Sequence, residues 1–276
     1  MGKKDKKSKS GLYKNKTTLT VYLILRGLII LAMVRAIFRQ EYQNVFFCAL
    51  SLILLIMPSI ISRKLEIMLP STLEIIILLF IFAAEILGEM NSFYVRVPHW
   101  DTMLHTINGF LCAAIGFALV DMLNRDDRFS FKLSPVYLAM VAFCFSMTVG
   151  VLWEFFEFSG DYLFGMDMQK DTVVNAIHTV NLDKTMSNTV VHVKDIVDVI
   201  VVHSDGSQEA LGLGGYLDVG IQDTMKDLFV NLIGAVVFSI IGFFFVKEKG
   251  KGRVASRFIP QVVSPEETDK PTEQKE

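Results

Sequence analysis

The chain has 276 residues, of which 52% are hydrophobic and 20% are charged, and its formal net charge is −2 at pH 7. Apolar runs of about twenty residues and a mean hydropathy of +0.44 exceed what a soluble core contains, so we predict a multi-pass membrane protein. The near-neutral charge argues against a nucleic-acid-binding protein and against an acidic scaffold.

Six apolar segments are long enough to cross about 30 Å of hydrocarbon as helices. We therefore predict an all-α polytopic membrane protein with transmembrane helices over 18–38, 44–62, 70–89, 101–123, 135–158 and 224–246. The predicted organisation is a disordered basic tail (1–17), helices 1–5 (18–159), an insert (160–222), helix 6 (223–247) and a disordered tail (248–276). The first tail does not read as a cleaved signal, because no small-residue cleavage site follows it.

Lysine and arginine are distributed unevenly between the connections. One side receives the lysine-rich first seventeen residues, Arg63 and Lys64, and the basic residues of 125–132 and 247–257. The other side receives only Arg39, Arg96, Lys170, Lys184, Lys194 and Lys226. The positive-inside rule then predicts that both termini are cytoplasmic and that the insert lies outside the cytoplasm.

The insert at 160–222 is too long to be a turn. Its stretch "TVVHVKDIVDVIVVH" is rich in valine and isoleucine, and Asp205-Gly206 is a hairpin signal. We therefore predict a small β-containing extracytoplasmic insert between helices 5 and 6. Its histidines, His178, His192 and His203, have no ligand-like spacing, and we interpret them as surface residues.

Acidic residues gather at the predicted outer ends of the helices. The fourth helix begins with "WDTMLHTINGF", which places Asp101 and His105 four residues apart on one face. The fifth ends with "VLWEFFEF", which contains Glu154 and Glu157 near the C-terminus, where the helix dipole disfavours anions. The sixth and third helices add further acids, so four helices would present carboxylates at one depth.

The sixth helix begins with "DTMKDLFVNLIGA", where Asp223, Asp227 and Asn231 follow one stripe. The third helix adds Glu85 and Glu89 at the same predicted end. Asp223, like Asp101, lies near a helix N-terminus, where an ordinary cap is an equally good interpretation.

Carboxylates at a partly dehydrated boundary must be protonated, paired with a cation or bound to a metal ion. Oxygen ligands with one imidazole suit Mg²⁺, Mn²⁺ or Zn²⁺, among which the sequence does not distinguish. Cationic alternatives are His105, Arg96, Lys226, Arg26 and Arg35. We predict catalytic roles for His105, Glu154 and Glu157, and metal ligation by Asp101, His105, Glu154, Glu157, Asp223 and Asp227.

The three motifs together resemble the YjdF-like family of uncharacterised bacterial inner-membrane proteins, and more weakly VanZ-like membrane proteins. The resemblance covers the last three spans and, loosely, the whole helical body. It implies a location in the bacterial cytoplasmic membrane and the same six site residues. The chain departs from the family pattern in its long insert and in Asp218, which is five residues ahead of Asp223.

These observations favour an acidic, metal-binding pocket at the outer face that acts on a lipid or lipid-linked envelope substrate. The expected chemistry is metal-assisted hydrolysis or transfer, with a carboxylate or His105 as general base. One alternative is a cation or proton translocator, although the acids cluster at one face and no internal repeat is visible. The other is an envelope scaffold that binds through its insert.

Overall fold

The computed structural model describes residues 15–64, 67–125, 133–248, 255–259 and 261–262. Within these ranges, six helical spans are long and apolar enough to cross a membrane, which confirms the predicted fold class. Most of both tails that we predicted to be disordered lies outside the described residues. Of the second tail, Ala255–Arg257 forms a 3₁₀ turn, and Ile259 is buried in a core cluster.

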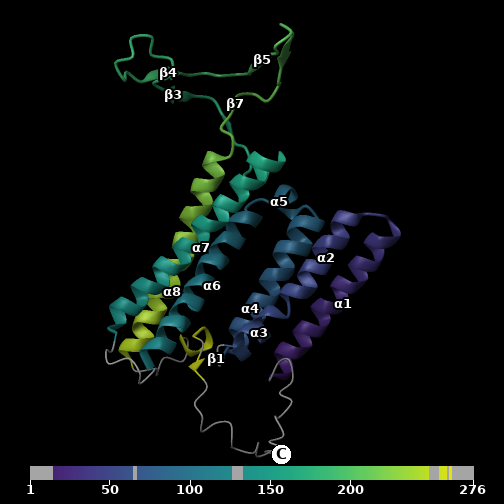
Figure 1. Cartoon of the computed structure of the whole chain (residues 1–276), viewed down its shortest axis with the longest axis vertical. Helices are drawn as coiled ribbons and strands as arrows, with labels where there is room; N and C mark the ends of the chain where they lie inside the picture. The colour runs from purple at the N-terminus through teal and green to yellow at the C-terminus, as the bar shows by residue number, and fades with distance from the viewer. Residues whose placement is uncertain (1–14, 65–66, 126–132, 249–254, 260, 263–276) are drawn as a thin grey trace, which may run out of the picture. The chain divides into compact units, whose positions relative to one another are not determined.

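Four of these spans are single helices, and the second and third spans are each divided between two helical elements (Figure 1). In chain order the helices are α1 (Lys16–Phe38), α2 (Tyr42–Leu54), α3 (Met57–Lys64), α4 (Ser71–Ile81), η1 (Phe82–Met90), α5 (Phe93–Arg96), α6 (Trp100–Arg125), α7 (Pro135–Phe164), α8 (Ile221–Lys247) and η2 (Ala255–Arg257). The predicted span boundaries agree with these to within a few residues, except that α7 continues beyond the predicted end at 158 to Phe164.

Local sequence explains where the second and third spans depart from a single α-helix. The second span breaks between α2 and α3 just ahead of Pro58, because proline has no amide to donate to the carbonyl four residues earlier and its ring clashes with that carbonyl. The third span changes at Phe82 into the π-helix η1, which carries Glu85 and Glu89. π-Helices are rare, and most occur as single-turn bulges inside α-helices.

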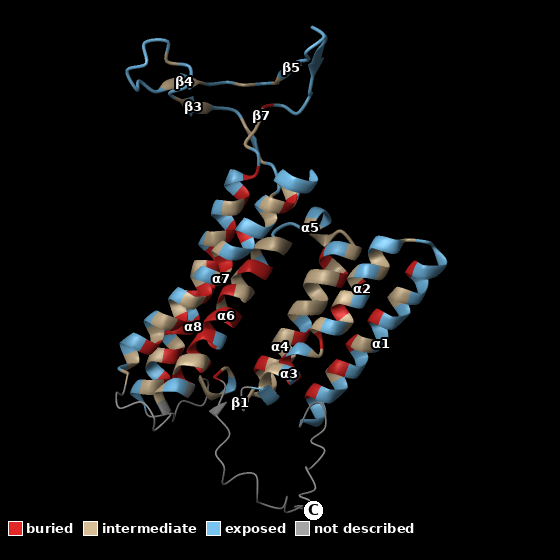
Figure 2. Cartoon of the chain, in the orientation of Figure 1, coloured by how far each residue is buried: buried red, intermediate tan, exposed pale blue. Residues whose placement is uncertain are grey.

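The chain divides into two compact units, one of residues 1–150 and 230–276 and one of residues 151–229. In the first unit, a cluster of Tyr22, Leu25, Ile29, Cys48 and Leu78 joins α1, α2 and α4. A second cluster, centred on Phe117, Leu138 and Phe238, joins α4, α6, α7 and α8. Figure 2 shows in red where buried residues lie along the helices. Many apolar side chains of α1 remain exposed, as is expected for a surface in contact with lipid.

The second unit contains the end of α7, the start of α8 and the insert between them. The insert strands are β2 (Val173–Val174), β3 (Ile177–Thr179), β4 (Val191–Val193), β5 (Ile200–Val202), β6 (Gln208–Ala210) and β7 (Tyr216–Leu217). They form three antiparallel pairs, β2 with β7, β3 with β4, and β5 with β6. The predicted β-containing insert is confirmed.

The hairpin predicted at Asp205-Gly206 is the connection between β5 and β6. The Ser207 carbonyl accepts the His203 amide at 2.9 Å, and Gly206 has a φ of +86°. Glycine adopts that conformation without a steric penalty. In the first unit, a further pair joins β1 (Ile67–Met68) to β8 (Gln261–Val262).

Candidate functional site

Three spans of the first unit meet around the side chain of Asn231, which is 0% exposed. Its Nδ2 lies 3.5 Å from the Ser146 carbonyl oxygen, and its Oδ1 lies 3.5 Å from Asn108 Nδ2. A Cβ added at Gly109 would lie 2.1 Å from the Asn231 carbonyl oxygen, and one added at Gly150 would lie 2.7 Å from Asn231 Nδ2. These five residues, which we call the Asn231 layer, fix how α6, α7 and α8 align in the first unit.

Each of these helices carries a predicted site residue one turn from the Asn231 layer. His105 precedes Gly109 by four residues, Glu154 follows Gly150 by four, and Asp227 precedes Asn231 by four. Residues four apart lie on the same helix face, about 6 Å apart along the axis. The side chains are buried, since His105 is 8% exposed, Glu154 is 4% exposed and Asp227 is 1% exposed.

Asp101 and His105 form a pair within the first turns of α6. His105 Nε2 lies 3.4 Å from Asp101 Oδ1. This separation equals one edge of a tetrahedron whose metal–ligand bonds are about 2.1 Å long. Asp101, His105 and Asp227 each offer one ligand atom, and these atoms lie within 4.8 Å of one another. This Asp-His-Asp group could therefore hold a metal ion.

The two remaining acids of the predicted site accept hydrogen bonds from their own unit. Trp153 Nε1 donates to Glu157 Oε1 at 2.8 Å, so this bond connects two successive turns of α7. Asp223 accepts the Lys170 amide at 3.0 Å and the Lys226 ammonium at 2.8 Å. Lys226, which we considered as a counter-charge, pairs most closely with Asp223, and its Nζ also lies 3.8 Å from Asp227 Oδ1.

Aspartates fasten the base of the insert to the ends of α7 and α8. Asp218 accepts the amides of Thr172 at 2.8 Å and Gln222 at 2.9 Å, so it closes the stem and caps α8. Asp161 accepts the Gln169 amide at 2.9 Å. Asp218, which sequence reasoning left in doubt, is thus engaged in structural hydrogen bonds, and the role of Asp161 was missed.

The same stem is anionic. Partial burial raises the pKa of Asp171 above its usual value, and the charges of Asp167, Asp218 and Asp161 raise it further, while Lys170 opposes them. These residues lie at the end of α7 and in the insert, and none of them belongs to the Asp-His-Asp group. Their charges therefore describe the stem and not the candidate metal site.

Sequence reasoning also missed most of the Asn231 layer. Asn108, Gly109, Ser146 and Gly150 are small or neutral residues that carry no catalytic signal. A signal was nevertheless present, because a glycine stands four residues from His105 and another stands four residues from Glu154. Small residues permit close approach of helices in membranes. The third-span acids Glu85 and Glu89 are, by contrast, not members of the Asp-His-Asp group.

Comparison with known proteins identifies the family to which this sequence belongs. A family model described as "Predicted membrane protein (DUF2238)" matches residues 21–248. An uncharacterised protein of Thermotoga maritima is 30% identical over 81 residues, which are 29% of this chain and 40% of that relative. No solved structure matches significantly. The family description is compatible with the resemblance to YjdF-like proteins.

Proposed function

As the chain belongs to this family of membrane proteins, we propose that its last three spans bind a divalent metal ion for metal-assisted hydrolysis or transfer on a lipid or lipid-linked envelope substrate. The observation that carries the proposal is the grouping of Asp101, His105 and Asp227 at one end of α6 and α8. The continuity of α8 supports it, because Asn231 is packed against α6 and Asp227 lies one turn along the same helix.

The donor set fits a catalytic metal ion. Two carboxylates neutralise the charge of a divalent ion, and one imidazole adds a borderline ligand. Three protein ligands leave a position open for water or substrate, as in catalytic zinc sites. When bound, the ion would acidify its water and stabilise developing negative charge. Asp101, His105 and Asp227 would hold the ion, and Zn²⁺ or Mn²⁺ suits an imidazole-containing set better than Mg²⁺.

We assign Glu154 as the general base of the proposed reaction. It lies one turn from Gly150 on α7, as His105 and Asp227 lie one turn from the Asn231 layer on α6 and α8. A general base must lie within hydrogen-bond reach of the water that it deprotonates, so this assignment requires Glu154 to approach the metal-bound water. Glu157 and Asp223 lie a further turn out and would form the rim that the substrate approaches.

The residues around Glu154 suit a substrate held at the membrane interface. The end of α7 exposes several aromatic side chains, which are characteristic of the level of the lipid headgroups. They are Trp153, Phe155, Phe156, Phe158, Tyr162 and Phe164. A site one or two turns from such a belt can be reached by the headgroup of a lipid or of a lipid-linked molecule.

An apolar layer favours this reaction over ion translocation. Beyond the Asn231 layer, Phe117 and Phe238 are fully buried, and both Phe110 and Phe117 pack edge-on against Phe238. Another buried acid, Asp121, lies on α6 beyond Phe117. A relay of ions through the membrane would need polar groups across this layer. The apolar character of this layer supports a metal site that is reached only from the end of α6 that carries Asp101.

Metal analysis of the purified full-length protein tests the proposal. After dialysis against Zn²⁺ or Mn²⁺, we expect about one bound ion per chain, and a loss of tenfold or more in affinity for His105→Ala and Asp227→Asn. Asp121→Asn is the matched control, because it removes a buried carboxylate from the other end of α6. Thermal unfolding of each variant verifies that it remains folded. Wild-type metal content in both ligand variants would refute the metal site.

The visible spectrum of bound Co²⁺ distinguishes a metal-ligand role of Glu154 from a general-base role. With Co²⁺ as the probe, we expect Glu154→Gln to retain the ion but to shift the pH at which the visible Co²⁺ spectrum changes as the bound water ionises. Loss of Co²⁺ from Glu154→Gln would instead make Glu154 a ligand and contradict its assignment as base. Glu157→Gln should change neither quantity.

A further inference from the structure

The β3–β4 hairpin brings together two histidines that the sequence separates by 14 positions. His178 and His192 are directly opposite in the strand register. Their Nδ1 atoms lie 2.7 Å apart, and their ring centroids lie 4.7 Å apart at an interplanar angle of 70°. We interpreted both as unrelated surface residues, because their spacing along the chain gives no indication of this pairing.

We propose that His178 and His192 form a two-histidine site for a transition-metal ion of tetragonal geometry, with Cu²⁺ as the preferred ion and Ni²⁺ second. This site is independent of the Asp-His-Asp group, with which it shares no residue. Both side chains are exposed, so the coordination positions that the histidines leave open face solvent and can be completed by water or by another molecule's ligands.

The two nitrogens lie at hydrogen-bond distance, and their separation also suits neighbouring ligands of one class of metal ion. With metal–nitrogen bonds of about 2.0 Å, neighbouring ligands of a square-planar ion are about 2.8 Å apart, whereas those of a tetrahedral ion are about 3.3 Å apart. The observed 2.7 Å matches the first value. Square-planar or tetragonal coordination by nitrogen is typical of Cu²⁺ and Ni²⁺, and Cu²⁺ binds a given set of such ligands most tightly.

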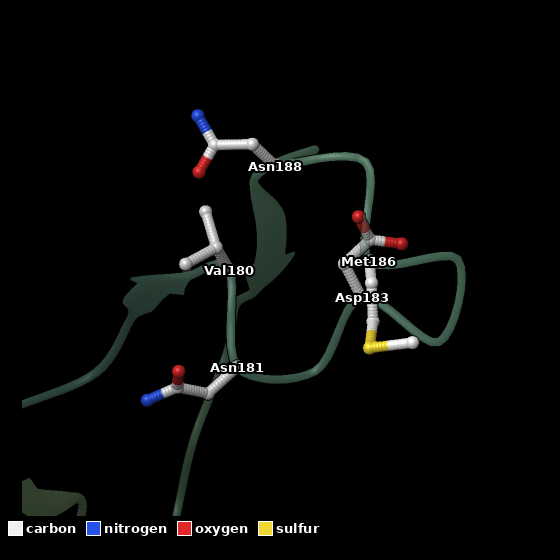
Figure 3. Close-up of a pocket in the computed structure, with 5 residues that line it drawn as sticks. All are labelled: Val180, Asn181, Asp183, Met186 and Asn188. Atoms are coloured by element: carbon white, nitrogen blue, oxygen red, sulfur yellow. The ribbon is translucent and has the colours of Figure 1, made fainter.

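The loop between β3 and β4 is organised around the carboxylate of Asp183, which Figure 3 shows beside Met186. The carboxylate of Asp183 accepts the backbone amides of Thr185, Ser187 and Thr189 at 2.9, 3.0 and 3.0 Å. The Thr185 and Ser187 hydroxyls also donate to it, at 2.5 and 3.2 Å. These bonds, that of the Thr185 hydroxyl first, hold the pKa of Asp183 well below its usual value.

This loop matters because a bidentate site requires that both ligands be held at a fixed separation. An unconstrained connection of this length would let the strands separate or shift, and the second imidazole would then bind as an independent ligand. With the hairpin closed, the second imidazole acts at a high effective concentration. Chelation of this kind raises affinity by about 100-fold over a single imidazole.

Cu²⁺ binding to the full-length protein in detergent tests the inference. To exclude the Asp-His-Asp group, the measurement is made on His105→Ala protein and compared with the same protein carrying His178→Ala or His192→Ala. We expect one Cu²⁺ per chain, an electron paramagnetic resonance spectrum with nitrogen couplings from two imidazoles, and affinity about 100-fold lower in each of the two histidine variants.

His203→Ala is the matched control. His203 is also an exposed histidine of an insert hairpin, but it faces Glu209, whose Oε2 lies 3.5 Å from its Nε2. Its removal should leave Cu²⁺ affinity unchanged. Hydrogen exchange of the Asp183 loop amides shows whether each variant keeps the hairpin. With an intact hairpin, equal affinity in the His178→Ala, His192→Ala and His203→Ala proteins would overturn the site, whatever the outcome at the Asp-His-Asp group.

Discussion

Replacement of Gly109 by alanine tests the helix packing on which the candidate site depends. The added Cβ would lie 2.1 Å from the Asn231 carbonyl oxygen, which is a backbone atom and cannot rotate away. To reach an ordinary contact distance, α6 and α8 would have to separate by more than about 1 Å. Overpacking of this kind costs about 1–3 kcal/mol. Metal–ligand distances tolerate only about 0.2 Å, so the variant should also lose bound metal.

Thermal unfolding in detergent, with metal analysis of the same samples, measures both effects. We expect the Tm of Gly109→Ala to fall by several degrees, on the order of 2–10 °C, and its metal content to fall at least tenfold. Gly27→Ala is the control, because a Cβ at Gly27 in α1 would meet nothing within 4 Å. Alanine is the better helix former, so Gly27→Ala should not lower the Tm. A Gly109→Ala protein with wild-type Tm and metal content would refute the packing argument.

Three smaller changes test other parts of the structure. Asp183→Asn should accelerate hydrogen exchange of the loop amides that donate hydrogen bonds to this carboxylate. Because folding lowers the pKa of Asp183, its stabilisation is present above the unfolded pKa of about 4 and is lost as the pH falls through the folded pKa. Unchanged protection of the wild-type loop amides well below pH 4 would contradict this role. Asp218→Ala should cost about 1 kcal/mol and expose the Gln222 amide to exchange, and an unaltered exchange rate there would argue against the cap. Ser146→Ala removes a 2.7 Å hydrogen bond to the Gly109 carbonyl and should lower the free energy of unfolding by about 1 kcal/mol. The variant should retain its metal ion. Complete loss of the metal ion would contradict a purely structural role of this bond.

Hydropathy located the six spans because lipid imposes long apolar helices, whatever packing they adopt. It placed the end of α7 at 158, whereas the helix continues to Phe164. The polar residues of this last turn read as loop, but Asp161 lies on the helix and binds the returning chain. The β5–β6 hairpin was predictable from Asp205-Gly206, whereas β3 and β4 are joined by a long connection that the Asp183 hydrogen bonds organise.

Helical periodicity predicted which acids share a face, but it could not show which of them accept structural hydrogen bonds. The bond from Trp153 to Glu157 joins residues four apart and could have been anticipated. The bond from the Lys170 amide to Asp223 joins residues 53 apart and depends on how the insert folds back. The pairing of His178 with His192 depends on strand register, which the sequence did not specify.

The position of a carboxylate within its element separates the candidate ligands from the structural acids. Asp161 lies in the last turn of α7, and Asp183 and Asp218 lie in loops. In all three positions, backbone amides outside the helix ladder are available to donate hydrogen bonds to the carboxylate. Asp227 and Glu154 lie inside α8 and α7, where the amides around them are already used in the helix ladder. A buried carboxylate in that position must interact with another side chain or with an ion. Carboxylates at the base of the insert therefore accept structural hydrogen bonds, whereas those one turn from the Asn231 layer are suited to metal ligation or proton transfer.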